Sequence, residues 1–227
     1  MLERHRQRLL SRDVYSNVGG DTGTATQWKR VANWDEFLRQ NGVRQSNIDS
    51  IRTSGFFAAI YKNQKTGEVT VAFRGTQCPG NGCIKDSIAD YDAAKGILTT
   101  QYKAASDLTS MVKNKLGSNV TLTGHSLGGA LASYAGLNNK VSSVVTFNAA
   151  RNPLSQGSKQ NTSQLNFFTR DEVIGDPNKS GILGSGQLPG QSIIVDSNVQ
   201  MKNIADDALA GHSINNIIGP LSNQALK

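Results

Sequence analysis

The chain has 227 residues, of which 37% are hydrophobic, and 24 Lys and Arg residues outnumber 17 Asp and Glu residues, for a net charge of +7. This length suits one domain with a single core, over residues 1–227, and is short for two. No hydrophobic run approaches the roughly 18 residues of a membrane-spanning helix, and the charged N-terminal segment does not form an ordinary secretion signal. No motif for a metal, a nucleotide or RNA occurs, so we expect no metal site, no cofactor and no nucleic-acid partner.

The first 15 residues predict a helix with one hydrophobic face and one basic face. The residues expected to face the core are Leu2, Leu9, Leu10 and Val14. The densest basic cluster of the chain lies on the same helix, and we expect it to be a solvated face formed by Arg4, Arg6, Arg8 and Arg12. The net positive charge also favours attraction to anionic surfaces such as phospholipid headgroups.

The next elements begin after a Gly- and Thr-rich loop at residues 19–26. Asn33 is the predicted cap of a short helix over residues 34–40. Two strand-like runs follow, at residues 55–63 and 68–75, and Gly67 in the turn between them predicts a hairpin.

From residue 86 onward, predicted helices and strands alternate. The expected helices cover residues 100–116 and 127–137, and the expected strands cover residues 120–124, 144–149, 164–169 and 193–195. Alternation of this kind favours a mostly parallel central sheet flanked by helices, an α/β fold. Helical pieces are expected around His212, within a loop-rich region that follows Ser180.

The sequence from Gly124 to Gly128, Gly-His-Ser-Leu-Gly, fits the motif G-x-S-x-G. It lies between a predicted strand and a predicted helix, which is the setting of the nucleophile in α/β-hydrolases. Glycine at both ends removes side chains that would collide where the chain reverses sharply and presents Ser126 on an exposed tip. We therefore expect Ser126 to be a catalytic nucleophile.

A serine hydroxyl needs a base that accepts its proton, and in this fold the acid and then the histidine follow the serine along the chain. The three histidines are His5, His125 and His212. His5 precedes the serine, and His125 sits beside it on the turn and should point elsewhere. By elimination, His212 is the predicted base.

The triad acid must lie between Ser126 and His212. Asp171 is preferred because it directly follows a predicted strand, and functional loops lie at the carboxyl ends of parallel strands. Asp176 is the second choice, and the other acidic residues in the interval are Glu172, Asp196, Asp206 and Asp207.

Hydrolysis of an ester also needs hydrogen-bond donors for the oxyanion of the tetrahedral intermediate. One is expected from the backbone N–H after the nucleophile, at Leu127. The second is expected at the end of the strand 68–75, where Thr76 offers both an N–H and a hydroxyl.

The only two cysteines, Cys78 and Cys83, flank the turn-forming sequence Pro-Gly-Asn-Gly. Such a turn brings their Cα atoms within bridging distance, so a disulfide is expected, with two reduced thiols as the alternative.

The motifs VAFRGT, GHSLGG and TRDEV, followed by a late Gly-His, resemble those of the class 3 lipase family, whose best-known members are fungal triacylglycerol lipases. The resemblance implies an α/β-hydrolase fold, with Ser126, Asp171 and His212 as the triad and with Thr76 and Leu127 in the oxyanion hole. It also implies a lid at residues 84–90, in which Ser87 stands where those lipases often carry Trp. The N-terminal part is more similar to bacterial relatives, which include lipase domains delivered as toxins.

The expected activity is hydrolysis of carboxylic esters in lipids, as a lipase or phospholipase that acts on membrane glycerolipids. The alternatives are a soluble-ester or feruloyl-type esterase and a catalytically inactive lipid-binding module. We expect a peripheral contact with membranes, export without a signal peptide into the envelope of a target cell as an antibacterial effector or toxin, and a cognate immunity-type inhibitor protein. A cytoplasmic location is the alternative.

Overall fold

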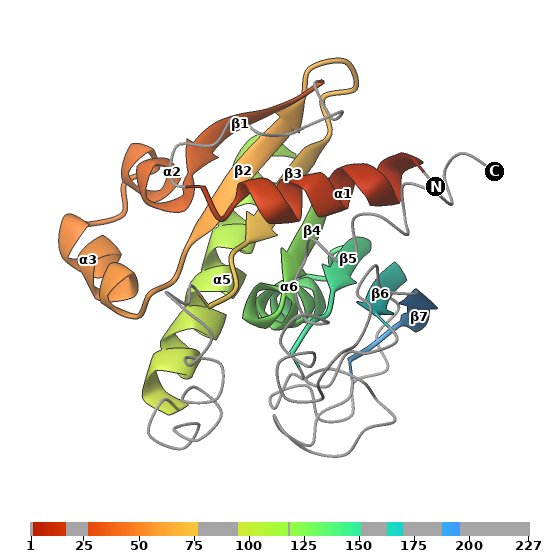
Figure 1. The fold of residues 1–227 in the computed structure, drawn as a ribbon. Coiled ribbons are helices and arrows are strands. Elements are labelled where there is room, and N and C mark those ends of the chain that lie inside the picture. Colours follow the sequence, from red (N-terminus) through yellow and green to blue (C-terminus); the bar gives the residue numbers. More distant parts are fainter. Residues whose placement is uncertain are drawn as a thin grey trace.

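A seven-stranded sheet forms the centre of this computed structural model, which describes residues 2–16, 27–76, 95–117, 119–150, 163–169 and 188–195. The strands lie side by side in chain order, β1 to β7 (Figure 1). The pairs β1/β2 and β2/β3 are antiparallel, and every pair from β3 to β7 is parallel. The sheet is thus mostly parallel, as predicted. Its strands are β1 (Trp28–Asn33), β2 (Ala58–Asn63), β3 (Val69–Phe73), β4 (Val120–His125), β5 (Ser143–Phe147), β6 (Ser163–Thr169) and β7 (Gln191–Val195).

Helices cover both faces of the sheet. Alternate residues of a strand point to opposite faces, and in β2 the side chain of Ile60 belongs to the core with α5 and α6, whereas Tyr61 packs with α1. In Figure 1, α1 crosses in front of the central strands. The described helices are α1 (Leu2–Asp13), α2 (Trp34–Gln40), α3 (Gln45–Thr53), α5 (Lys95–Leu116) and α6 (Leu127–Asn138).

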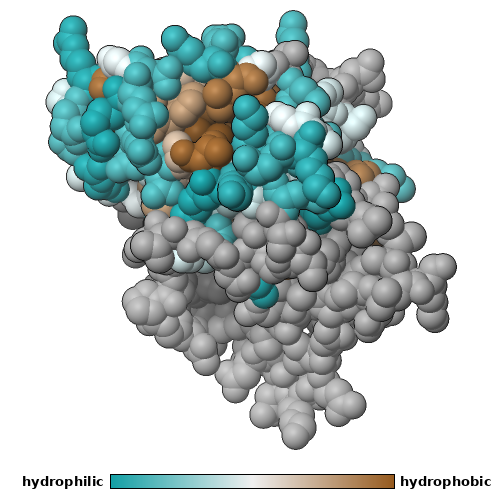
Figure 2. All heavy atoms as spheres, turned by 90° about the horizontal axis from the view of Figure 1, so that it is seen from above, coloured by the Kyte–Doolittle hydropathy of each residue, from teal (hydrophilic) through white to brown (hydrophobic). Residues whose placement is uncertain are grey.

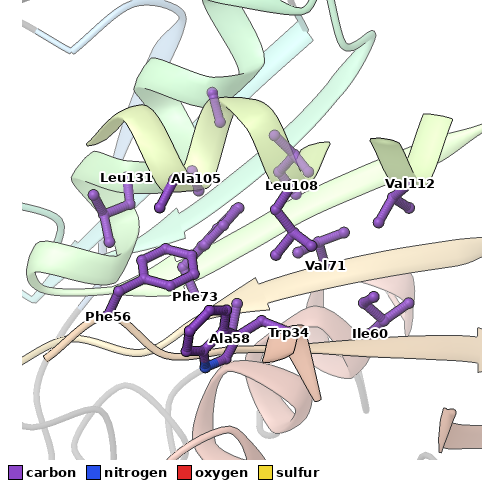
Figure 3. Packing of buried hydrophobic residues seen from close by; sticks show 14 of the residues in the cluster. Trp34, Phe56, Ala58, Ile60, Val71, Phe73, Ala105, Leu108, Val112 and Leu131 are labelled. Carbon is purple, nitrogen blue, oxygen red and sulfur yellow. The ribbon is translucent and has the colours of Figure 1, made fainter. Parts of the chain in front are cut away.

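The larger core lies between the sheet and the helices α2, α5 and α6 (Figure 3). Aromatic rings fill its centre: Phe56 makes an edge contact with Trp34 at a centroid distance of 5.4 Å and a tilted contact with Phe73 at 6.2 Å. Leu108 and Leu131 bring α5 and α6 onto this cluster. The packing fixes β3, β4 and the start of α6 relative to one another, and these elements carry the site described below.

Several predicted elements are confirmed with small shifts. The hairpin forms as predicted, with Gly67 at a φ of +76°. Helix α5 starts at Lys95, earlier than the predicted residue 100, and ends before Gly117, whose φ is +103°. Helix α2 begins at Trp34, but Asn33 makes no side-chain cap, because its Oδ1 accepts a hydrogen bond from Arg30 Nη1 at 3.2 Å.

The prediction of a solvated basic face was wrong for Arg8, which is fully buried. Leu9, Leu10 and Val14 are buried as predicted, but α1 lies across the sheet closely enough to cover more than this hydrophobic stripe. Burial, and then the charge of Arg12, lower the pKa of Arg8 to about 10. The side chains of Leu2 and Arg4 lie outside the described residues.

The described surface is mainly hydrophilic in the view of Figure 2, with the largest hydrophobic area enclosed by hydrophilic residues. In the part of the chain that the structure describes, the large hydrophobic residues that are exposed are Val31, Leu116 and Ile194, on three separate elements. None of the described helices combines the length and hydrophobicity needed to cross a membrane.

Candidate active site

Ser126 occupies a sharp turn between β4, which ends at His125, and α6, which starts at Leu127. Its backbone has a φ of 56° and a ψ of −129°, in a region that residues with a Cβ rarely adopt. The Ser126 N–H donates to the Phe147 carbonyl at 3.2 Å, and the Ser126 carbonyl accepts from the N–H of Ala150 at 3.0 Å. These bonds to β5 and to the segment after it hold the strained turn in place, and Ser126 remains partly exposed.

The two glycines of the motif allow very close backbone packing. A Cβ atom on Gly124 would lie 2.2 Å from the carbonyl oxygen of Gly128, and a Cβ atom on Gly128 would lie 2.2 Å from that of Phe73. Neither position has room for a side chain, which is the role predicted for these glycines from the motif.

The segment after β3 lies against this turn. Phe73 is opposite Gly124 in the parallel register of β3 and β4, so both chains leave the sheet at the same edge. A Cβ atom on Gly75 would lie 2.7 Å from the His125 carbonyl oxygen and 3.1 Å from Ser126 Cβ. Thr76 follows and is exposed.

Helix α6 directs its N-terminus at the same place. The N–H of Leu127, the first residue of α6, has no acceptor within the helix, because an α-helix leaves its first N–H groups unbonded. The carbonyl of Ser126 accepts from Gly129 N–H at 3.0 Å and from Ala130 N–H at 3.3 Å. The turn therefore brings together a serine, a free helix end that favours negative charge, and the Gly75–Thr76 segment.

Tyr15, just beyond α1, reaches this site, and sequence reasoning missed it. Its hydroxyl oxygen lies 3.0 Å from His125 Nδ1 and accepts a hydrogen bond from the Gly75 N–H at 3.1 Å. Burial raises the pKa of Tyr15 well above its usual range, although the Gly75 N–H and the charge of Arg74 act in the opposite direction. His125 is itself buried and turned toward Tyr15, so its side chain points elsewhere, as predicted.

Arg74 places a positive charge beside the Gly75–Thr76 segment. Its guanidinium lies over the ring of Phe57, at 4.3 Å from the centroid. Burial lowers the pKa of Arg74, while the nearby Tyr15 raises it. A guanidinium in this setting stays charged near neutral pH.

Several predicted site residues lie outside the described residues: Asp171, Asp176, His212, Cys78, Cys83 and the segment 84–90. The strand that precedes Asp171 is described. Its last residue, Thr169, donates its N–H to Asn148 Oδ1 at 2.9 Å, which ties the end of β6 to the segment after β5. Among the described residues, no group of three or more His, Cys, Asp or Glu side chains could hold a metal ion.

A family model described as phospholipase-like, Tle-like phospholipase domain, matches residues 6–166. The chain belongs to this Tle-like phospholipase domain family. The matched range of the Tle-like domain includes Tyr15, Gly75 and Ser126 and ends before Asp171 and His212. The extracellular phospholipase A1 of Serratia liquefaciens is 34% identical over 142 residues, which make up 63% of this chain and 40% of that protein. The chain thus aligns with less than half the length of that relative.

Solved fungal lipases share the fold of this Tle-like domain. The triacylglyceride lipase of Rhizomucor miehei is 17% identical with a TM-score of 0.56, over 87% of this chain and 80% of the lipase. The Lip2 lipase of Yarrowia lipolytica is 14% identical with a TM-score of 0.53, over 97% of this chain and 90% of the lipase. At these identities the similarity establishes the fold alone. The α/β-hydrolase fold and the resemblance to class 3 lipases, both predicted from motifs, are confirmed.

Proposed function

We propose that the protein hydrolyses carboxylic ester bonds of membrane glycerophospholipids through an acyl-enzyme on Ser126. The observation that carries this proposal is the turn itself: a partly exposed serine, held at a φ of 56°, heads α6 and lies beside the Gly75–Thr76 segment. A fold maintains such strain where the surrounding contacts enforce it, most often at functional sites. Membership of a phospholipase-like family supports the lipid substrate.

In the proposed acylation step, Ser126 Oγ attacks the ester carbonyl carbon while His212 accepts the hydroxyl proton. Asp171 orients the imidazole and stabilises its protonated form. The bond to the glycerol oxygen then breaks, and the alcohol leaves with the proton that His212 returns. A water molecule repeats the sequence on the acyl-enzyme and releases the fatty acid.

The oxyanion of each tetrahedral intermediate would accept hydrogen bonds from the Leu127 N–H and from Thr76. Two features support this role: the Leu127 N–H has no acceptor within α6, and Gly75 packs against Ser126 Cβ. Donors that are fixed before the reaction stabilise the developing charge without a cost of reorganisation.

The name of the Serratia relative, extracellular phospholipase A1, supports a proposal about the position of cleavage. We infer that this chain also releases the acyl group from the sn-1 position. Contact with the bilayer would be peripheral and largely electrostatic, because the net charge of the chain is +7.

A phospholipase of this kind would damage the membranes of the cell that makes it. We therefore propose that it is an antibacterial effector that acts in the envelope of a target cell. A small immunity-type protein that blocks the Ser126 site or holds the segment 83–94 is the expected partner.

The first experiment identifies the bond that is cut. Vesicles of 1-palmitoyl-2-oleoyl phosphatidylethanolamine and phosphatidylglycerol are incubated with the wild type, Ser126→Ala, His212→Ala and the exposed-serine control Ser110→Ala, and the products are measured by mass spectrometry. Palmitate release is expected from the wild type and Ser110→Ala, with a loss of about four to six orders of magnitude in the two site variants. Oleate as the main product would reject the sn-1 assignment, and cleavage of only soluble short-chain esters would indicate an esterase.

The second experiment tests the place of action. Wild type and Ser126→Ala are expressed in a bacterium, once in the cytoplasm and once directed to the periplasm, while growth and lysophospholipid release are followed. Growth arrest confined to the periplasmic wild type is expected. Equal growth of all four strains with unchanged lipids would contradict the effector role.

A further inference from the structure

We propose that Tyr15 is a positioning residue, whose hydroxyl fixes the Gly75–Thr76 segment against the nucleophile turn by joining the Gly75 N–H to the His125 ring. The inference rests on the proposed function, because it concerns how the oxyanion donors are held. It adds a role for the N-terminal segment, which contributes none of the groups that would react.

The hydroxyl of Tyr15 bridges two elements that are far apart in the sequence. It accepts a hydrogen bond from Gly75 N–H at 3.1 Å and lies 3.0 Å from His125 Nδ1. A hydroxyl has one proton to give, and a neutral imidazole has one nitrogen that accepts. In the proposed bridge, Tyr15 donates to Nδ1 and the His125 ring carries its own proton on Nε2.

The fit around Gly75 is tight enough for such a bond to define a position. A Cβ atom on this residue would lie 2.5 Å from the Tyr15 hydroxyl oxygen and 2.7 Å from the His125 carbonyl oxygen. The segment therefore packs against both Tyr15 and the nucleophile turn. Removal of the hydroxyl would take away the acceptor of the Gly75 N–H.

The position of Tyr15 is well fixed, because α1 is hydrogen-bonded to the sheet through buried polar side chains. Ser11 Oγ lies 2.7 Å from Thr123 Oγ1 on β4, and Gln7 Nε2 donates to Thr70 Oγ1 on β3 at 3.2 Å. Strands β3 and β4 are the ones that lead to Gly75 and Ser126. The raised pKa of Tyr15 keeps its hydroxyl protonated, and so able to donate, throughout the working pH range.

The test compares Tyr15→Phe with Tyr61→Phe, using hydrolysis of a soluble short-chain p-nitrophenyl ester below the unfolding temperature of both variants. The control removes a buried tyrosine hydroxyl that donates to Asp13 Oδ2 at 2.6 Å, in the same part of the molecule. For Tyr15→Phe we expect kcat to fall roughly 10- to 100-fold, as for a small misplacement of catalytic groups. KM should change by less than about threefold, and kcat of Tyr61→Phe should stay within about threefold of the wild type.

A spectroscopic measurement tests the contact itself. Nitrogen NMR of the wild type should find His125 Nδ1 unprotonated and accepting a hydrogen bond, and the Gly75 amide should exchange roughly tenfold faster in Tyr15→Phe than in the control. A ring protonated on Nδ1 at neutral pH would overturn the inference even if Tyr15→Phe failed to fold.

Ser126→Ala, assayed in parallel, distinguishes failure of the positioning role of Tyr15 from failure of the proposed function. If it is inactive while Tyr15→Phe keeps the wild-type kcat, the positioning role is wrong and the proposed function stands. If Ser126→Ala retains full activity, the proposed function fails and the role of Tyr15 fails with it. An equal loss of kcat in Tyr15→Phe and Tyr61→Phe would indicate general loosening of α1 and would also reject the inference.

Discussion

Gly128, in the first turn of α6, packs so closely on β3 that a Cβ atom at this position would lie 2.2 Å from the Phe73 carbonyl oxygen. Backbone cannot give way as a flexible side chain can, so Gly128→Ala should destabilise the protein by about 3 kcal/mol. Gly42→Ala is the control, because its Cβ would meet nothing within 4 Å and only its φ of +84° opposes the change, at a cost of about 1–2 kcal/mol. Urea unfolding curves measure both. Equal destabilisation would show that the close contact with Phe73 relaxes freely.

Relief of strain at the nucleophile turn should be measurable apart from activity. Ser126→Gly and Ser126→Ala both remove the hydroxyl, so both should be inactive. Because the φ of residue 126 is 56°, the glycine variant should be the more stable of the two by about 1 kcal/mol. Thermal unfolding of the two variants decides the matter, and an alanine variant as stable as the glycine variant would argue against strain at this turn.

The choice of triad acid is open to a direct comparison. Asp171→Asn should lower the rate roughly 10⁴-fold by favouring the wrong tautomer of His212, whereas Asp176→Asn should lower it far less. Thr169, at the end of β6, is held by Asn148, and Asp171 is the nearer of the two candidates to it in the sequence. Single-turnover rates with a soluble ester measure the two effects. The reverse order would make Asp176 the acid.

Thr76→Val tests the second oxyanion donor. If the hydroxyl donates, kcat should fall roughly 10²-fold, with little change in KM. Thr66→Val, at an exposed threonine in the hairpin turn, is the matched control and should leave kcat unchanged. A loss below about threefold in Thr76→Val would mean that backbone N–H groups alone stabilise the oxyanion.

Cys78 and Cys83 should form a disulfide in protein purified under air. So short a loop would add only roughly 2 kcal/mol by the chain-entropy model, so its use would be to stiffen the segment before residues 84–90. Titration of free thiols in the unfolded protein, with a chemically reduced sample as control, gives the answer. Two free thiols in the air-purified sample would reject the bridge, and a bridge would favour action outside the reducing cytosol.

Hydrophobic patterns in the sequence were sufficient to predict the hairpin and the strands and helices from β4 onward, but not β1. In that strand Trp28 and Ala32 are buried, while Val31 is 47% exposed. A bulge between Arg30 and Ala32 breaks the alternation of inward and outward side chains, so the signal of period two is lost. Helix α3 was missed for a different reason: within it, Ile48 is the one buried residue, which leaves little periodicity to detect.

The candidate site also contains residues that the sequence predicts and residues that it does not. Ser126 and its flanking glycines are contiguous in the sequence, and the strand–turn–helix context identifies them. Tyr15 could not be found, because nothing in the sequence links a tyrosine at the end of the first helix to Gly75 or to His125. Such a contact depends on how α1 crosses the sheet, which is a tertiary property. The burial of Arg8 was missed for the same reason.

The parallel register of β3 and β4 sets Phe73 opposite Gly124. Because Gly75 and Ser126 leave neighbouring strands at the same height, the spacing between two hydrogen-bonded strands, about 4.8 Å, sets their distance. The length of chain between them does not. Residues 77–94 can therefore gain, lose or exchange side chains without drawing the two segments apart. The sheet thus sets the distance between Gly75 and Ser126, and the sequence between them can vary without changing it.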